Sequence, residues 1–173
     1  MKSLSSFRPV VGGREAPAKD GADRARAGYV VESPIDLVGL LAAAHAPAAG
    51  AVVLFSGEVR DSNRGQDVAY LEYEAHVALA EKVIGEILVE AKEKWGLLVA
   101  VAQHRTGRVE VGEAAVVVIT AAVHRGEAYA ANRHIIDRIK HEAPIWKCEH
   151  YQDGSQEWGN NCNCQEKRGL SEL

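Results

Sequence analysis

The sequence predicts an α+β fold with a mostly antiparallel sheet, and two observations carry this prediction. Segments with the apolar runs or alternating patterns of strands come in adjacent groups along the chain. Three other segments have the 3.6-residue period of amphipathic helices, and they do not alternate strictly with the strands. The resulting order is helix, two strands, helix, three strands, helix and a terminal hairpin, which favours antiparallel pairing.

Length and composition set the class of protein. The 173 residues suffice for one domain with a hydrophobic core, and the apolar fraction of 47% is typical of a globular protein. A net charge of -4 argues against a nucleic-acid partner, so an anion site must be a local cluster of cations. No apolar run approaches the roughly 20 residues that span a bilayer, and residues 1–10 lack the apolar core of a signal peptide. We therefore expect a cytoplasmic protein.

The chain divides into three parts by composition. Residues 1–28 are rich in glycine, alanine and charged residues without a period, and we expect a disordered extension there. Residues 29–158 hold all the periodic segments and are expected to form the domain. Residues 159–173 are a polar tail.

The first expected elements are a short strand at 29–31, a helix at 33–45 and a strand at 50–55. Ser33 is placed as the N-cap of the helix and Pro34 in its first turn. Apolar residues follow these two at helical spacing. The strand is predicted by a run of apolar residues that indicates burial.

A polar loop at 61–65, a strand at 68–76 and a helix at 77–95 come next. Alternation and β-favouring aromatic residues predict the strand. The helix has one apolar stripe, with glutamates and lysines on its other face, and Gly96 is placed as its C-cap.

The last third is expected to contain strands, a turn and one helix. In chain order they are a strand at 97–103, a turn at 104–107, strands at 108–111 and 114–123, a helix at 126–141, an extended segment at 145–151 and a turn at 153–154. The strand at 114–123 is apolar throughout, which predicts burial on both faces. Pro144 ends the helix. The inward side of the helix is predicted to carry Ala130, Ala131, His134, Ile135 and Ile139.

The segment 124–147 holds most of the candidate functional groups. His124 and Arg125 lie between a strand and a helix, where free backbone N–H groups and the positive end of the helix favour an anion. Lys140 lies in the last turn of the helix. Lys147 has apolar neighbours, which lower the pKa of an amine and suit it for proton transfer or nucleophilic attack. This collection suits an anionic small molecule.

Each of these residues also has a structural interpretation. His124 can cap the helix, and Lys140 can pair with the helix dipole. Lys147 can extend past Trp146 into solvent. Arg60, which precedes the polar loop, can be a surface arginine.

The cysteines predict no metal site and no disulfide framework. Cys162 and Cys164, even with His150, match no strong zinc spacing. Cys148 and Lys147 are adjacent on a strand, so their side chains are expected on opposite faces. Three cysteines crowded into the last quarter fit reduced thiols.

Five short motifs occur in order between about residue 29 and residue 158. They are FSGEVR at 55–60, LEYEAH at 71–76, HRTGRVEVGE at 104–113, HR at 124–125 and KHEAPIWK at 140–147. Together they resemble the large, catalytic subunit of molybdopterin synthase. The resemblance implies an α/β hammerhead fold with a small added β subdomain, and a homodimer.

The resemblance also implies a reaction and a partner. A small ubiquitin-like sulfur carrier, whose extended C-terminal Gly-Gly ends in a thiocarboxylate, binds each large subunit to give a heterotetramer. Two sulfurs pass to cyclic pyranopterin monophosphate (precursor Z), which yields the dithiolene of molybdopterin in molybdenum cofactor biosynthesis. No metal or other cofactor takes part.

Residue roles follow from matching the motifs. The resemblance implies Lys140 and Lys147 as catalytic residues. It implies a substrate pocket formed by Phe55, Arg60, His124 and Arg125. Two other functions are compatible with the residues alone: a non-catalytic dimeric module that binds a peptide tail or a phosphorylated metabolite, and a phosphate-ester hydrolase.

Overall fold

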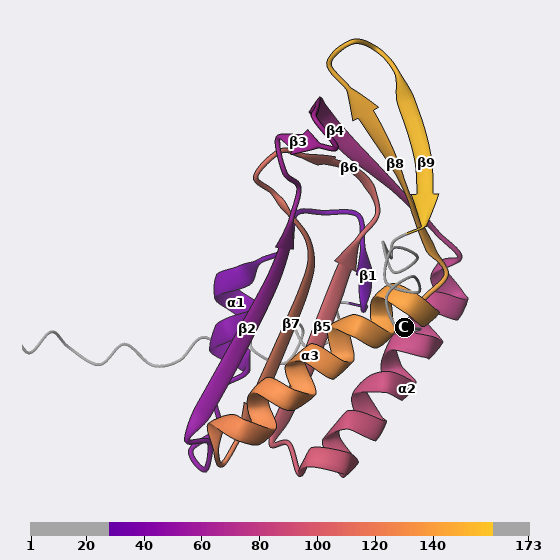
Figure 1. Cartoon of the computed structure of the whole chain (residues 1–173). Coiled ribbons are helices and arrows are strands. Elements are labelled where there is room, and N and C mark those ends of the chain that lie inside the picture. The colour runs from indigo at the N-terminus through magenta and orange to yellow at the C-terminus, as the bar shows by residue number, and fades with distance from the viewer. Residues whose placement is uncertain (1–27, 161–173) are drawn as a thin grey trace, which may run out of the picture.

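The computed structural model describes residues 28–160, which form two sheets and three helices (Figure 1). The first sheet contains four strands in the order β1 (Val30–Val31), β5 (Val99–Arg105), β7 (Ala114–Ala122) and β2 (Ala51–Glu58). The second contains β3 (Ser62–Asn63), β4 (Gln66–Ala75), β8 (Ile145–Tyr151) and β9 (Gln156–Asn160) in that order, with β6 (Gly107–Glu110) also paired to β4. Only β1 and β5 pair in parallel among these strands. The predicted α+β class with mostly antiparallel pairing is confirmed, and the second sheet corresponds to the expected added β subdomain.

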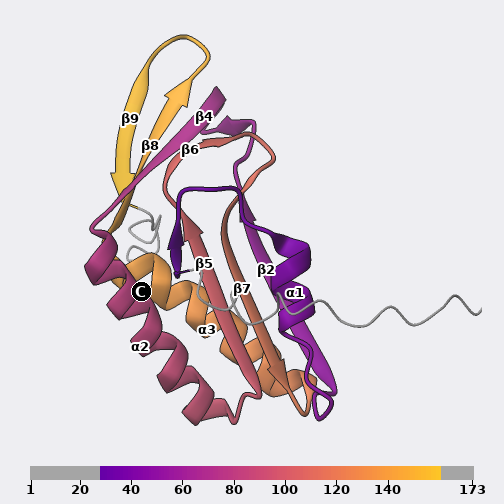
Figure 2. The same cartoon turned by 180° about the vertical axis from the view of Figure 1, so that it is seen from behind.

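The helices cover both faces of the first sheet. Helices α2 (Val77–Trp95) and α3 (Arg125–Glu142) lie on one face, and α1 (Leu37–Ala43) lies on the other (Figures 1 and 2). Strand β7 runs between the two layers and is buried at every position after Ala114, as its apolar sequence predicted. None of the described helices is long and apolar enough to cross a membrane.

Helix α3 is fixed to the sheet by polar contacts as well as by its apolar face. The Asn132 amide donates to the carbonyl oxygens of Val53 (3.1 Å) and Val118 (3.0 Å), which belong to neighbouring strands. The Thr120 hydroxyl donates to the carbonyl oxygen of Ala128 at 2.9 Å. Because the side chains of Asn132 and Thr120 are buried, these contacts satisfy polar groups that would otherwise be costly.

The predicted inward side of α3 was partly right. Ala131, Ile135 and Ile139 are buried, and His134 packs against Trp95 with ring centroids 4.8 Å apart. Ala130 is exposed, so its placement was wrong. The buried stripe instead includes Ala128, Asn132 and Ile136, which follow at intervals of four residues.

The largest local error concerns α1. The helix was expected from Ser33 to His45, but it begins at Leu37 and its N-cap is Asp36. The Asp36 carboxylate accepts a hydrogen bond from the Gly39 backbone N–H at 2.9 Å. A carboxylate is a strong N-cap acceptor, and it also complements the positive end of the helix.

Helix α2 matches its predicted bounds, and Gly96 ends it in the left-handed conformation (φ 60). Strand β2 continues three residues beyond the expected end, to Glu58, and the predicted loop at 61–65 contains the short strand β3. The turn expected at 104–107 was wrong at His104 and Arg105, which belong to β5, and at Gly107, which begins β6. The reason is tertiary: β1 pairs with this end of β5, and the His104 N–H donates to the Tyr29 carbonyl at 2.7 Å.

The last elements agree with the predicted terminal hairpin. Strand β8 covers the expected 145–151, and a turn at 153–154 leads into β9. The predicted extension (1–28) and tail (159–173) lie outside the described residues, apart from Gly28, Gly159 and Asn160.

Candidate functional site

Three cations come together where the C-terminal end of α3 meets the second sheet. Lys140 lies in the last turn of α3, Lys147 lies in β8, and Arg60 follows β2. Burial is the largest cause of the lowered pKa of Lys140. The positive charges of Lys147 and Arg60 lower this pKa further, whereas the negative charge of Asp137 raises it. The structure therefore unites three of the predicted site residues.

The lowered pKa of Lys140 has a chemical consequence. A lysine amine with its ordinary pKa is almost fully protonated near neutral pH. Since the pKa of Lys140 lies below that value, a larger fraction of its amine is neutral and available to accept a proton. Lys140 thus combines a position among cations with a capacity for proton transfer.

Lys147 is held by a buried carboxylate. Its Nζ donates to Glu149 Oε1 at 2.6 Å. Glu149 is only 7% exposed and also accepts hydrogen bonds from Asn63 Nδ2 (2.5 Å) and the Tyr151 hydroxyl (2.9 Å). Asn63 Oδ1 in turn accepts from Arg60 Nη2 at 3.4 Å. This network fixes Lys147 relative to Arg60.

The charge on Glu149 is secured by its hydrogen bonds. Burial by itself raises the pKa of this carboxyl group, but the bonds from Lys147, Tyr151 and Asn63 outweigh burial and leave the pKa lowered. Glu149 therefore stays ionised and compensates the charge of Lys147. Sequence reasoning missed Glu149, although its spacing of two residues from Lys147 on one strand already places both side chains on the same face.

His104 is a buried titratable group near the lysines that sequence reasoning also missed. Burial lowers its pKa to about 4, and the positive charge of Lys140 contributes, while a hydrogen bond with the Arg105 carbonyl opposes the shift. Its Nδ1 lies 2.9 Å from that carbonyl oxygen, and the Tyr73 ring packs edge-on at 5.0 Å. His104 is consequently neutral near neutral pH.

Phe55 lies in β2 and packs against the main hydrophobic core. A Cβ atom at Gly57 would lie 2.8 Å from Val116 Cγ1 and 3.3 Å from the Phe55 ring, so only glycine fits there without rearrangement. The β2–β7 register shifts between Gly57 and Glu58. Beyond this bulge, Val59 is buried and exchanges backbone hydrogen bonds with Gly112 and Glu113, which fixes the start of the segment that carries Arg60.

His124 and Arg125 lie at the opposite end of α3 and are exposed. His124 occupies the N-cap position, but its side chain makes no capping hydrogen bond, so the interpretation of His124 as a side-chain cap was wrong. Lys140 lies fifteen positions after Arg125 in the helix, which at a rise of 1.5 Å per residue is about 22 Å. Within one chain, the structure does not bring this pair to the lysines.

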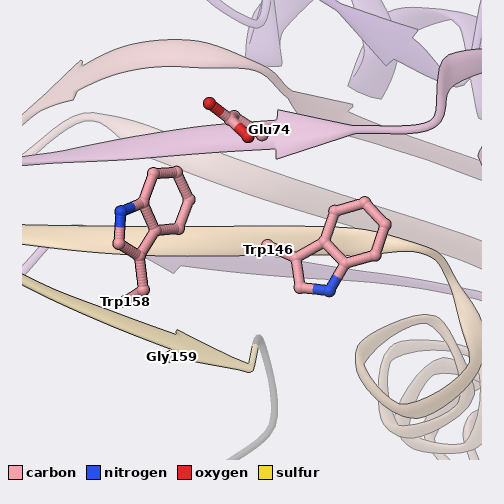
Figure 3. A pocket seen from close by; sticks show the side chains of 4 residues that line it. All are labelled: Glu74, Trp146, Trp158 and Gly159. Atoms are coloured by element: carbon pink, nitrogen blue, oxygen red, sulfur yellow. The ribbon is translucent and has the colours of Figure 1, made fainter.

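The face of the second sheet opposite Lys147 carries two tryptophans. An open pocket of about 360 Å³ is lined there by Glu74, Trp146, Trp158 and Gly159 (Figure 3). Trp146 and Lys147 are neighbours on β8 and point to opposite faces. Because Lys147 turns inward to Glu149, the alternative in which it extends past Trp146 into solvent was wrong.

The cysteine and metal predictions are tested only in part. Cys148 is buried, and burial followed by the charges of Glu72 and Glu149 raises its pKa, which disfavours a reactive thiolate. Cys162 and Cys164 lie outside the described residues. Among residues 28–160, no three His, Cys, Asp or Glu side chains are grouped as metal ligands.

Comparisons with known proteins agree with this arrangement. A family model described as MoaE protein matches residues 30–142. A molybdopterin synthase catalytic subunit from a Nostoc species is 42% identical over 135 residues, covering 78% of this chain and 82% of the relative. The corresponding subunit of Halalkalibacterium halodurans is 39% identical over 125 residues, covering 72% and 80%.

Solved structures give the same result. Molybdopterin synthase from Staphylococcus aureus superposes with a TM-score of 0.72 at 37% identity, covering 76% of this chain and 96% of that one. A complex of subunits 1 and 2 of molybdopterin-converting factor from Helicobacter pylori superposes with a TM-score of 0.63 at 25% identity, covering 75% and 88%. Sequence, fold and site together show that the chain belongs to the MoaE protein family, the family of molybdopterin synthase catalytic subunits.

Proposed function

We propose that this chain is the catalytic subunit of a molybdopterin synthase. It converts cyclic pyranopterin monophosphate to molybdopterin by transferring two sulfurs, as the resemblance implies. The observation that carries the proposal is the cluster of Lys140, Lys147 and Arg60 in a chain of this family, with the pKa of Lys140 lowered by burial and by the two neighbouring cations. Such a cluster suits an anionic substrate and proton transfer at one place.

The sulfur donor is a separate protein. We infer that a small ubiquitin-like carrier binds each copy of this chain and places its thiocarboxylated C-terminal Gly-Gly near the lysines. A Helicobacter pylori complex that joins the two subunits of the converting factor supports such an assembly. Two copies of this chain and two carriers then form a heterotetramer, and each sulfur transfer leaves a carrier that ends in a carboxylate.

The site residues divide into two roles in this proposal. Arg60 holds the cyclic phosphate through charge-assisted hydrogen bonds. Lys140, with its larger neutral fraction, promotes attack of sulfur on the pterin side chain or stabilises the departing carrier carboxylate. Lys147 assists proton transfer or opening of the cyclic phosphate, and Phe55 belongs to the substrate pocket, as the resemblance implies.

The pocket residues His124 and Arg125 enter the proposal from a second copy of the chain. Within one chain they lie about 22 Å from Lys140 along α3, which is too far for one small ligand to contact both ends of the helix. Since the family resemblance implies a homodimer, the pair of one copy contributes to the site of the other. Each dimer then holds two equivalent sites.

The proposal includes no metal and no organic cofactor, because the carrier thiocarboxylate supplies the sulfur. Turnover is accordingly expected to persist after dialysis against a metal chelator. A cytoplasmic location also belongs to the proposal, and fractionation of cells that express the chain would test it.

The deciding experiment combines the purified chain, thiocarboxylated carrier and cyclic pyranopterin monophosphate, with mass detection of the pterin product. We expect a product with two added sulfurs, and none with a carrier that ends in an ordinary carboxylate. Consumption of the cyclic phosphate without any carrier would instead establish a phosphate-ester hydrolase. Binding of both ligands with no change in mass would establish a non-catalytic binding module.

A further inference from the structure

The outer face of the second sheet, opposite Lys147, holds a pocket that the proposed reaction does not use. Trp146 and Trp158 line this pocket and are 44% and 50% exposed. The remaining lining residues are Glu74 and Gly159 (Figure 3). Exposed apolar surface bordered by polar groups is typical of interaction sites. This tryptophan pocket is therefore suited to holding a further segment or molecule.

Strand pairing sets the spacing of the two indole rings. Trp146 lies opposite Glu74 of β4 on one side and opposite Asn160 of β9 on the other. Trp158 lies opposite Cys148, which is two positions along β8 from Trp146. The two tryptophans are thus diagonal neighbours on one face, about 7–8 Å apart. At that spacing, one long side chain can contact both rings and still reach the Glu74 carboxylate.

The pocket is chemically matched to a cation. The face of an aromatic ring attracts a lysine or arginine head group, and tryptophan is the best of the aromatic side chains for this contact. Glu74 is exposed and forms no salt bridge within residues 28–160. Lys147 points to the other face of the sheet, and Arg108 pairs with Glu110. A cation from another part of the chain therefore fits the pocket.

The C-terminal segment 161–173 begins beside the pocket and carries two such cations. Its sequence is NCNCQEKRGLSEL, in which Lys167 and Arg168 are adjacent. Gly159, two residues before the segment, lines the pocket. The six residues 161–166 suffice to reverse the chain direction, since tight connections need about two to five residues. The asparagines at 161 and 163 favour such a turn.

Position favours this segment over the basic N-terminal extension. Residues 1–27 contain six lysines and arginines and three acidic residues. They join the domain at Gly28, whose carbonyl oxygen accepts a hydrogen bond from Gln103 of the first sheet. The C-terminal segment instead continues from β9, whose outer edge has no partner strand within residues 28–160. It therefore starts at the pocket, whereas the extension starts at the other sheet.

We propose that residues 161–173 fold back over the outer face of the second sheet and place Lys167 and Arg168 in the tryptophan pocket. The docking uses a surface outside the lysine cluster and does not depend on the proposed function. Trp146 and Lys147 are neighbours that point to opposite faces of β8. A segment held at the tryptophans consequently leaves the Lys147 face of the sheet uncovered.

Zero-length cross-linking of the full chain tests the docking. A carbodiimide joins an amine to a carboxylate only where the two are in contact, so a Lys167–Glu74 link is expected in peptide mass maps. Arg168→Lys is treated in parallel, so that either position can react. Glu74→Gln should abolish the link, and Lys82–Glu86, 3.8 Å apart on α2, is the positive control. Absence of any link from positions 167 and 168 to Glu74, while the control link forms, would overturn the docking.

Isotope labelling identifies the chain that supplies the segment. Labelled and unlabelled chains are unfolded, mixed and refolded before cross-linking, and links within one chain are expected, with no mixed-isotope products. Mixed products would assign the pocket to a second copy of the chain. Links from Glu74 to Lys2 or Lys19 would assign it to the N-terminal extension. Either result would overturn the proposal.

Charge reversal in the segment gives a second test. Lys167→Glu with Arg168→Glu places like charges beside Glu74 and is expected to shift the docking equilibrium toward the free segment by at least about 5-fold. Acrylamide quenching of tryptophan fluorescence should rise, and the rise should disappear when both pocket tryptophans are replaced by phenylalanine. Lys82→Glu with Lys92→Glu makes the same charge change at exposed positions of α2 and is the matched control. Equal quenching in the two double variants, with unchanged circular dichroism, would contradict docking in this pocket.

Discussion

The two ends of helix α3 differ in how their functional groups are held. At the C-terminal end, Lys140 is partly buried and Lys147 is fixed by Glu149. At the N-terminal end, His124 and Arg125 are exposed, and the histidine side chain makes no capping bond. The chain itself pre-organises one end and leaves the other open. Pre-organised groups suit the chemical step, whereas an exposed pair suits an approaching ligand or subunit.

The two lysines also differ in charge compensation. Lys147 has a buried carboxylate partner at 2.6 Å. Burial and the charges of Lys147 and Arg60 dominate the surroundings of Lys140, so its pKa is lowered despite Asp137. This difference favours Lys140 as the amine that exchanges a proton and Lys147 as a fixed cation. The predictions below separate these two roles, and then separate the two ends of the helix.

The largest effect is expected at Lys140. Lys140→Ala should lower kcat by about 10²–10⁴-fold, the usual contribution of a positioned acid or base. Lys140→Arg should not restore activity, because a guanidinium keeps the charge but does not release a proton near neutral pH. Single-turnover kinetics with thiocarboxylated carrier measure the loss, and Lys82→Ala, on the exposed face of α2, is the control. Full activity of Lys140→Ala would refute the assignment.

Among the groups at the C-terminal end of α3, Glu149 should contribute most to the free energy of unfolding. Glu149→Gln removes the charge that compensates Lys147 and should lower the free energy of unfolding by about 3 kcal/mol, as when one partner of a buried pair is lost. Urea denaturation measures it. The control is Glu157→Gln on β9, which is exposed and should change stability by less than about 0.5 kcal/mol. Equal effects in the two variants would mean that the Lys147–Glu149 contact is not an important ion pair.

The same residues show what sequence could and could not predict. Helix α2 was predicted from Val77 to Trp95 because its apolar stripe and Gly96 are local features. The hydrogen-bond network around Lys147 was not predicted. Asn63 and Glu149 are 86 residues apart in the sequence, and only the pairing of strands in the second sheet brings them into contact. His104 was assigned to a turn because nothing local indicates that β1 extends the sheet there. The motifs identified the lysines and Arg60, and the predicted helix at 126–141 already separated His124 from Lys140. Only the fold shows that Lys147 and Arg60 lie at the Lys140 end of this helix.

His104 should affect the pH dependence of stability. Its pKa is about 4 in the folded chain and about 6.5 when unfolded, so between these values the unfolded state binds the extra proton. Stability should therefore fall as pH falls from about 6.5 to 4, by up to about 3 kcal/mol from this residue. Unfolding of His104→Gln across that range should show a flatter slope than the wild type. A wild-type slope in His104→Gln would contradict the prediction.

The smallest effect is expected at the N-terminal end of α3, where the side chains are exposed. Arg125→Ala should raise KM for the pterin about 10-fold, which corresponds to one charge-assisted hydrogen bond, while kcat changes less. Its free energy of unfolding should not change measurably, because the side chain is exposed. Arg133→Ala is the control, since Arg133 is an exposed arginine on the same helix that pairs only loosely with Asp137 at 3.6 Å. A larger KM with unchanged stability would show that the open end binds substrate, although it lies about 22 Å from Lys140 in its own chain. Lost stability with an unchanged KM would instead make Arg125 a structural residue and confine the site to the C-terminal end.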